Sequence, residues 1–76
     1  MVIAYIMIKA NTSEADRLLE DVKDIDGILD AHIVAGDVDL IAKVEVESPE
    51  DVKEIAATNI QSIAGVETTE TYIAMS

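Results

Sequence analysis

Residues 36–46 read GDVDLIAKVEV and join two halves of the chain that share one plan. The first four residues are typical of a tight turn, because Gly and Asp are favoured where the backbone reverses direction. The next seven, Leu40 to Val46, form a run rich in β-branched residues that predicts a strand. The stretch therefore predicts a β-hairpin, with one strand before the turn and one after it.

The plan that this hairpin joins is strand, helix, strand, and it occurs twice. Residues 2–8 predict the first strand of the first half, and residues 40–46 are their counterpart 38 positions later. The closing strands are predicted at about residues 28–35 and 66–75, each after an Ile-x-Gly turn. Aligned without a gap, the halves share four identities: Ile3 with Ile41, Ala4 with Ala42, Ile25 with Ile63, and Gly27 with Gly65. A common βαβ pattern explains this similarity as well as an ancestral duplication does.

Each predicted helix carries an apolar stripe and begins after a capping residue. In the first half, either Thr12 or Ser13 can cap the helix. In the second half, Ser48 is the predicted cap, and Pro49 takes the first helical position, where its missing N–H costs nothing. The predicted stripes are Ala15, Leu18, Leu19, Val22 and Ile25 in the first helix, and Val52, Ile55, Ala56, Ile60 and Ile63 in the second.

Two βαβ units joined by a hairpin predict an α+β fold of the ferredoxin-like type. Its βαββαβ order gives a four-stranded antiparallel sheet with two helices on one face. A length of 76 residues supports a single domain, residues 1–76. Alternation along the first and third strands predicts which side chains lie beneath the helices: Val2, Ala4, Ile6, Ile8, Leu40, Ala42, Val44 and Val46.

The opposite face of the sheet is predicted to carry large apolar side chains. Alternation puts Ile3, Tyr5, Met7 and Ile41 on that face, and Tyr72 joins them if the last strand has the matching parity. The pattern leaves the parity of the second and fourth strands open. Large apolar residues on an uncovered sheet usually contact a partner, and a second copy is the most accessible partner for a small domain. We therefore expect a homodimer through this face; a semi-polar, solvated face is the alternative.

The composition excludes several classes of function. Asp and Glu number 16 against five Lys and Arg, so the net charge of −11 repels phosphate backbones and argues against direct nucleic-acid binding. No apolar run reaches the roughly 18 to 20 residues of a membrane span, and the N-terminus lacks the features of a signal peptide. We expect no membrane partner and a cytoplasmic location.

Catalytic and metal-binding patterns are weak. The chain has no cysteine, and its clustered carboxylates match no calcium-loop spacing, so neither a metal nor another cofactor is expected. His32 lies in a predicted strand, where a structural or interface role is more typical than catalysis. Arg17 is predicted to form ion pairs on the surface of the first helix. No Ser or Thr stands in a spacing that suggests a nucleophile with its base, so we expect no enzyme.

Two short motifs in order resemble the ligand-binding domain of the Lrp/AsnC transcription regulators, the RAM domain. The middle motif, Gly-x-aromatic-Asp before an apolar strand, corresponds to Gly36, Val38, Asp39, Leu40 and Ile41, with Val38 in place of the aromatic residue. The closing motif corresponds to Ile63, Gly65, Val66, Thr69, Thr71 and Ile73. The resemblance covers essentially the whole chain.

The resemblance implies a ligand-sensing domain that binds an amino acid or similar small molecule. It implies dimers formed through the sheets, often four closing into an octamer, with the effector between dimers. Gly36, Asp37 and Asp39 would lie near the effector, with Thr69 and Thr71 across it. Asp39 would pair with the α-ammonium group and the threonine hydroxyls or backbone N–H groups with the α-carboxylate. Gly36 and Thr71 could also serve turn and sheet geometry alone.

Family members carry an N-terminal helix-turn-helix, whereas this chain begins on its first strand and so resembles the stand-alone RAM proteins. Such a domain could modulate full-length Lrp/AsnC regulators by mixed assembly or by competing for effector. Three alternatives stay open. An ACT-like sensor would need a glycine in the loop at residues 9–13, where none occurs. A dimeric α+β barrel enzyme would need a catalytic residue such as His32, and a pure oligomerisation module would need no ligand.

Overall fold

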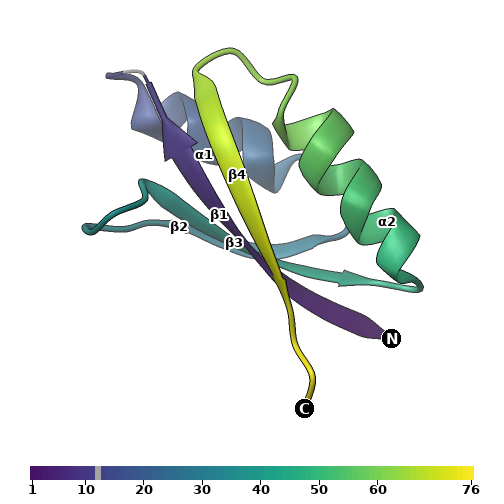
Figure 1. Cartoon of the computed structure of the whole chain (residues 1–76). Coiled ribbons are helices and arrows are strands. Elements are labelled where there is room, and N and C mark those ends of the chain that lie inside the picture. Colours follow the sequence, from purple (N-terminus) through teal and green to yellow (C-terminus); the bar gives the residue numbers. More distant parts are fainter. Residues whose placement is uncertain (12) are drawn as a thin grey trace.

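The computed structural model describes residues 1–11 and 13–76 and confirms the predicted order of elements. The first half contains β1 (Val2–Ala10), α1 (Ala15–Lys23) and β2 (Ile28–Ile33). The second half contains β3 (Leu40–Val46), α2 (Pro49–Lys53), η1 (Glu54–Ile60) and β4 (Val66–Ile73). The strands form one antiparallel sheet in the order β2-β3-β1-β4, and the helices lie on one of its faces (Figure 1). The ferredoxin-like fold is therefore confirmed.

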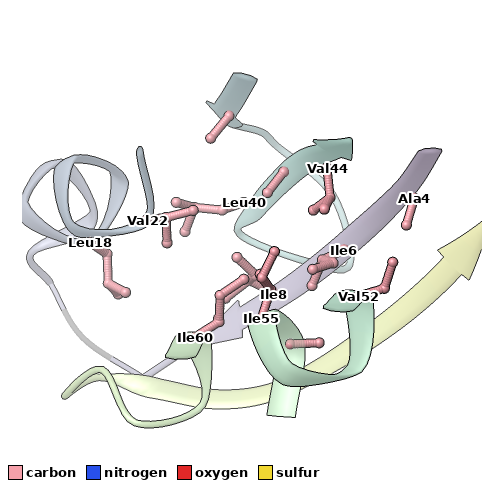
Figure 2. Packing of buried hydrophobic residues seen from close by; sticks show 13 residues of the cluster. Ala4, Ile6, Ile8, Leu18, Val22, Leu40, Val44, Val52, Ile55 and Ile60 are labelled. Carbon is pink, nitrogen blue, oxygen red and sulfur yellow. The ribbon is translucent and has the colours of Figure 1, made fainter. Parts of the chain in front are cut away.

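The core lies between the helices and the sheet, as the strand alternation predicts (Figure 2). From the sheet, Ala4, Ile6, Ile8, Leu40, Ala42 and Val44 are all fully buried. From the helices, Leu18, Val22, Val52, Ile55, Ala56 and Ile60 pack against them. Each buried Ile, Leu or Val side chain stabilises the fold by roughly 1.5–3 kcal/mol relative to exposure. The predicted face at β1 and β3 is confirmed, with Val2 and Val46 half-buried at its end.

The two helices begin differently. Ser48 caps α2 as predicted: its Oγ accepts a hydrogen bond from the Asp51 N–H at 3.4 Å, and Pro49 follows it. At α1 the cap prediction is wrong for Ser13, because Glu14 occupies the capping position. The alternative cap, Thr12, lies outside the described residues. Arg17 forms the predicted surface ion pairs, at 3.0 Å to Asp21 and 3.6 Å to Glu14.

Element ends differ from the sequence pattern in several places. At the two outer predictions, β1 continues past residue 8 to Ala10, and β4 ends at Ile73 and not at residue 75. The first helix ends at Lys23, so Ile25 packs from the turn that follows it. The strand predicted to reach residue 35 ends at Ile33, because the Val34 N–H donates to the Asp39 carbonyl and closes the loop. The second helix continues as a π-helix from Glu54 to Ile60, whose wider turns are not visible to a 3.6-residue pattern.

The two Ile-x-Gly turns have the same geometry, which supports the repeated plan. Gly27 has φ +100° and Gly65 has φ +101°, a backbone region that favours glycine. In each turn the residue after the glycine donates its N–H three residues back, Ile28 to Ile25 and Val66 to Ile63, both at 3.2 Å. These turns lead the chain from the end of each helix into the next strand of the sheet.

Candidate functional site

The five residues predicted for a dimer interface lie together on the face of the sheet that is turned away from the helices. The strand register puts Tyr5 opposite Tyr72 on β4, and Met7 opposite Ile41 on β3. Ile3 lies on the same side of β1, two residues from Tyr5. We call this surface the open face. Its tyrosines are accessible, with Tyr5 37% and Tyr72 53% exposed.

Charged side chains border the apolar centre of the open face. The strand register shows which side chains of β2 lie on this face, a question that the sequence pattern left open. On β2, Asp30 and His32 lie opposite Lys43 and Ile41, so both belong to the open face. His32 Nε2 and Asp30 Oδ2 are 3.0 Å apart, and His32 is exposed. Hydrogen bonds from the Ala31 N–H and then from His32 lower the pKa of Asp30. An apolar centre with a polar rim is the usual anatomy of a protein interface.

The opposite edge of the open face carries Glu70 and Tyr72 on β4. The Tyr72 hydroxyl donates a hydrogen bond to the Glu70 carboxylate. This hydrogen bond, together with the negative charge of Glu70, raises the pKa of Tyr72. The hydrogen bond therefore holds the Tyr72 hydroxyl to its own strand, and the register puts Tyr72 opposite Tyr5.

The loop at Gly36–Asp39 projects from the end of the sheet, in teal in Figure 1. Asp39 ties the loop to β1: its Oδ2 accepts from the Ala10 N–H at 2.8 Å, and its own N–H donates to the Ile8 carbonyl at 3.0 Å. Gly36 and Asp37 are exposed at the tip, and a Cβ at Gly36 would meet no atom within 4 Å. Asp39 thus has a structural role, whereas Gly36 and Asp37 face outward.

Thr69 and Thr71 lie together in a pocket between β4 and the second helix. The register puts them opposite Ile8 and Ile6, on the helix-covered side of this edge strand. The pocket has a volume of about 340 Å³. Its apolar walls are Pro49, Val52, Ala56, Ala57 and Ile73, and its polar groups are Lys53, Thr69 and Thr71. We call it the threonine pocket. The Thr69 Oγ1 donates to Gln61 Oε1 at 3.4 Å at its rim.

Within one chain, the two groups of predicted ligand residues are separate. Leu40, which follows Asp39, pairs with Ile8 from one side, and Thr69 pairs with Ile8 from the other. The whole width of β1 therefore stands between the loop and the threonine pocket.

Lys53 lines the threonine pocket but was not among the residues predicted for the site. Helical periodicity identifies the buried apolar stripe of a helix and does not identify a cation beside that stripe.

A second, larger cavity of about 510 Å³ lies on the other side of the second helix. We call it the acidic hollow, because five carboxylates line it: Asp26, Glu45, Glu47, Asp51 and Glu54. Across residues 1–11 and 13–76, no three His, Cys, Asp or Glu side chains are arranged to hold a metal ion.

Comparison with known proteins identifies the family. The model of the Lrp/AsnC ligand binding domain matches residues 3–76. This chain belongs to the Lrp/AsnC ligand-binding domain family. The family comprises regulatory ligand-binding domains of transcription regulators, not enzymes, which sets aside the barrel-enzyme and ACT-domain alternatives.

Individual relatives agree with this assignment. An uncharacterised HTH-type transcriptional regulator of Pyrococcus abyssi is 30% identical over 73 residues, covering 92% of this chain and 49% of the regulator. The chain thus spans about half the length of that curated relative. The crystal structure of TTHA0845 from Thermus thermophilus has a TM-score of 0.94 and 28% identity, covering 100% of this chain and 95% of that one.

A more distant structure shares the fold alone. The transcriptional regulator NMB0573 of Neisseria meningitidis, solved as a complex with L-Met, has a TM-score of 0.86 at 13% identity, covering 99% of this chain and 50% of that one. Among the described residues of this chain, no helix has the length and apolar character needed to cross a bilayer.

Proposed function

We propose that residues 1–76 form one sensing domain that binds an amino acid between subunits of a homo-oligomer. The observation that carries the proposal is the threonine pocket, in which the two threonines of the closing family motif line one cavity. Hydroxyl groups at the edge of an apolar cavity suit a small ligand with a carboxylate and an apolar part. The proposal agrees with membership of a ligand-binding family.

The separation of the two residue groups supports a site shared between subunits. The exposed tip at Gly36 and Asp37 is held away from the threonine pocket of its own chain by β1. A loop from a neighbouring copy has no such barrier. In the proposed complex, the α-ammonium group of the ligand pairs with the neighbour's loop, at Asp37 or at the Asp39 oxygen that Ala10 leaves free. Ligand binding then favours the assembled state, because only that state contains the complete site.

The open face is the proposed interface of the dimer. A typical stable interface buries about 800 Å² on each partner. This is roughly a sixth of the 4713 Å² of accessible surface of the chain, an area that one side of a four-stranded sheet can supply. Further assembly of dimers, up to an octamer, would bring each loop to a neighbouring pocket. The proposal also includes a cytoplasmic location and modulation of full-length Lrp/AsnC regulators through mixed assembly or competition for effector.

The test is calorimetric titration of the wild-type chain with each common amino acid, combined with light scattering to measure oligomer mass. We expect one or a few amino acids to bind and to increase the assembled fraction. Thr69→Val and Thr71→Val remove a hydroxyl at nearly constant volume and should each weaken binding about tenfold. Thr58→Val, on the exposed side of η1 and outside the threonine pocket, is the matched control.

Two outcomes contradict parts of the proposal. A wild-type chain that binds no amino acid, while remaining a dimer, would be an oligomerisation module and not a sensor. A monomer at all concentrations, with or without amino acids, would refute the interface as well.

A further inference from the structure

The second helix separates two cavities of opposite chemistry. The acidic hollow carries five carboxylates, whereas the threonine pocket carries no carboxylate at all among its lining residues. The chain as a whole has 16 acidic and five basic residues. The net charge of −11 repels anions from most of the surface, so an anion can be held only where a local cation outweighs that field. The threonine pocket has such a cation in Lys53.

Lys53 is the last residue of α2 and borders the apolar wall formed by Val52, Ala56 and Ala57. Within the ranges 1–11 and 13–76, the ion pairs involve Arg17 and His32, and none involves Lys53. Its ammonium group is therefore available to an incoming anion. The Thr69 and Thr71 hydroxyls line the same cavity and can donate to the same anion.

We infer that Lys53 binds the carboxylate of the ligand and that the ligand is a carboxylic acid with a small aliphatic body. The inference rests on the proposed function and specifies the ligand class for that site. The apolar walls contact the aliphatic part, because they offer no charged partner for an acidic or basic side chain. A volume of about 340 Å³ is near the lower limit of about 300 Å³ for small-molecule pockets, which suits a ligand of this size.

The test uses three probes that share one aliphatic skeleton: L-leucine, L-leucinamide, which lacks the carboxylate, and 4-methylpentanoate, which lacks the amino group. Each is titrated calorimetrically into wild-type, Lys53→Gln and Lys53→Arg chains. Lys23→Gln is the matched control, because it makes the same charge change in the last turn of α1, outside the threonine pocket.

We expect leucine to bind the wild type at least tenfold more tightly than leucinamide, since a charge-assisted hydrogen bond accounts for a factor of ten or more. Lys53→Gln should lose about tenfold in leucine affinity and most of the discrimination against leucinamide. Lys53→Arg should retain both, and Lys23→Gln should match the wild type. The deaminated probe should remain sensitive to Lys53→Gln, because its carboxylate occupies the same position.

Each negative result contradicts a different part of the proposal. If the wild type binds amino acids but Lys53→Gln leaves affinity and leucinamide discrimination unchanged, the Lys53 assignment is wrong and the proposed function stands. If lysine or glutamate binds more tightly than leucine, the aliphatic ligand class is wrong. If no amino acid binds the wild type, the proposed function falls and this inference falls with it.

Discussion

Gly27→Ala should destabilise the fold strongly, for two reasons that add. The backbone at Gly27 has φ +100°, and an L-residue in the left-handed region costs about 1–2 kcal/mol. The added Cβ would also lie 2.8 Å from Ile55 Cδ1 and 3.1 Å from Val46 Cγ1. Ile55 is a core residue, so relieving this clash means overpacking or shifting the core, at about 1–3 kcal/mol. The sum is an expected loss of roughly 2–5 kcal/mol in the free energy of unfolding.

Urea unfolding followed by circular dichroism measures this loss, at one fixed protein concentration because oligomer stability depends on concentration. Gly36→Ala is the matched control. Its Cβ would meet no atom within 4 Å, and its φ is not in the positive range, so stability should stay constant or rise by up to about 1 kcal/mol. The same control reports on function, because a loss of ligand affinity in a stable Gly36→Ala chain would support the loop as part of the site.

Equal unfolding midpoints for Gly27→Ala and wild type would refute the reasoning. That result would mean that the turn changes conformation without a cost and that Ile55 moves freely, in conflict with its burial. A large loss for Gly36→Ala would be equally contradictory, since the added Cβ would meet no atom within 4 Å.

Three further predictions concern the open face and the loop. Tyr5→Glu puts a charge at the centre of the proposed interface and should yield monomers by light scattering; an unchanged dimer would remove this face from the interface. Asp39→Ala leaves the Ala10 N–H without its acceptor and should cost about 1–3 kcal/mol in thermal or urea unfolding, so an unchanged midpoint would contradict its structural role. The raised pKa of Tyr72 means that protonated Tyr72 stabilises the fold below pH 10, a contribution lost as pH rises through the folded value. The free energy of unfolding should therefore fall less steeply above pH 10 in Tyr72→Phe than in the wild type. An equally steep fall in both chains would show that the hydrogen bond to Glu70 does not contribute.

The sequence predicts the core well because two local signals agree there. In β1 and β3, period-2 alternation of apolar residues identifies the buried side directly, and the structure buries Ala4, Ile6 and Ile8 as expected. The cap at Ser48 is predicted because its chemistry is local. At α1 the local signal fails for Ser13, because Glu14 takes the capping position; Arg17 pairs with Glu14 and also reaches the Ala64 carbonyl in the other half of the chain.

The sequence by itself determined the βαββαβ order, the buried face of the two central strands and the family, because these depend on local periodicity and short motifs. Only the tertiary structure decided the parity of the edge strands, since it follows from pairing with β1 and β3 across the chain. The tertiary structure also decided that Lys53 shares a pocket with Thr69 and Thr71. Residues so far apart in sequence meet only because β4 returns beside β1 under the second helix, and no local pattern encodes that contact.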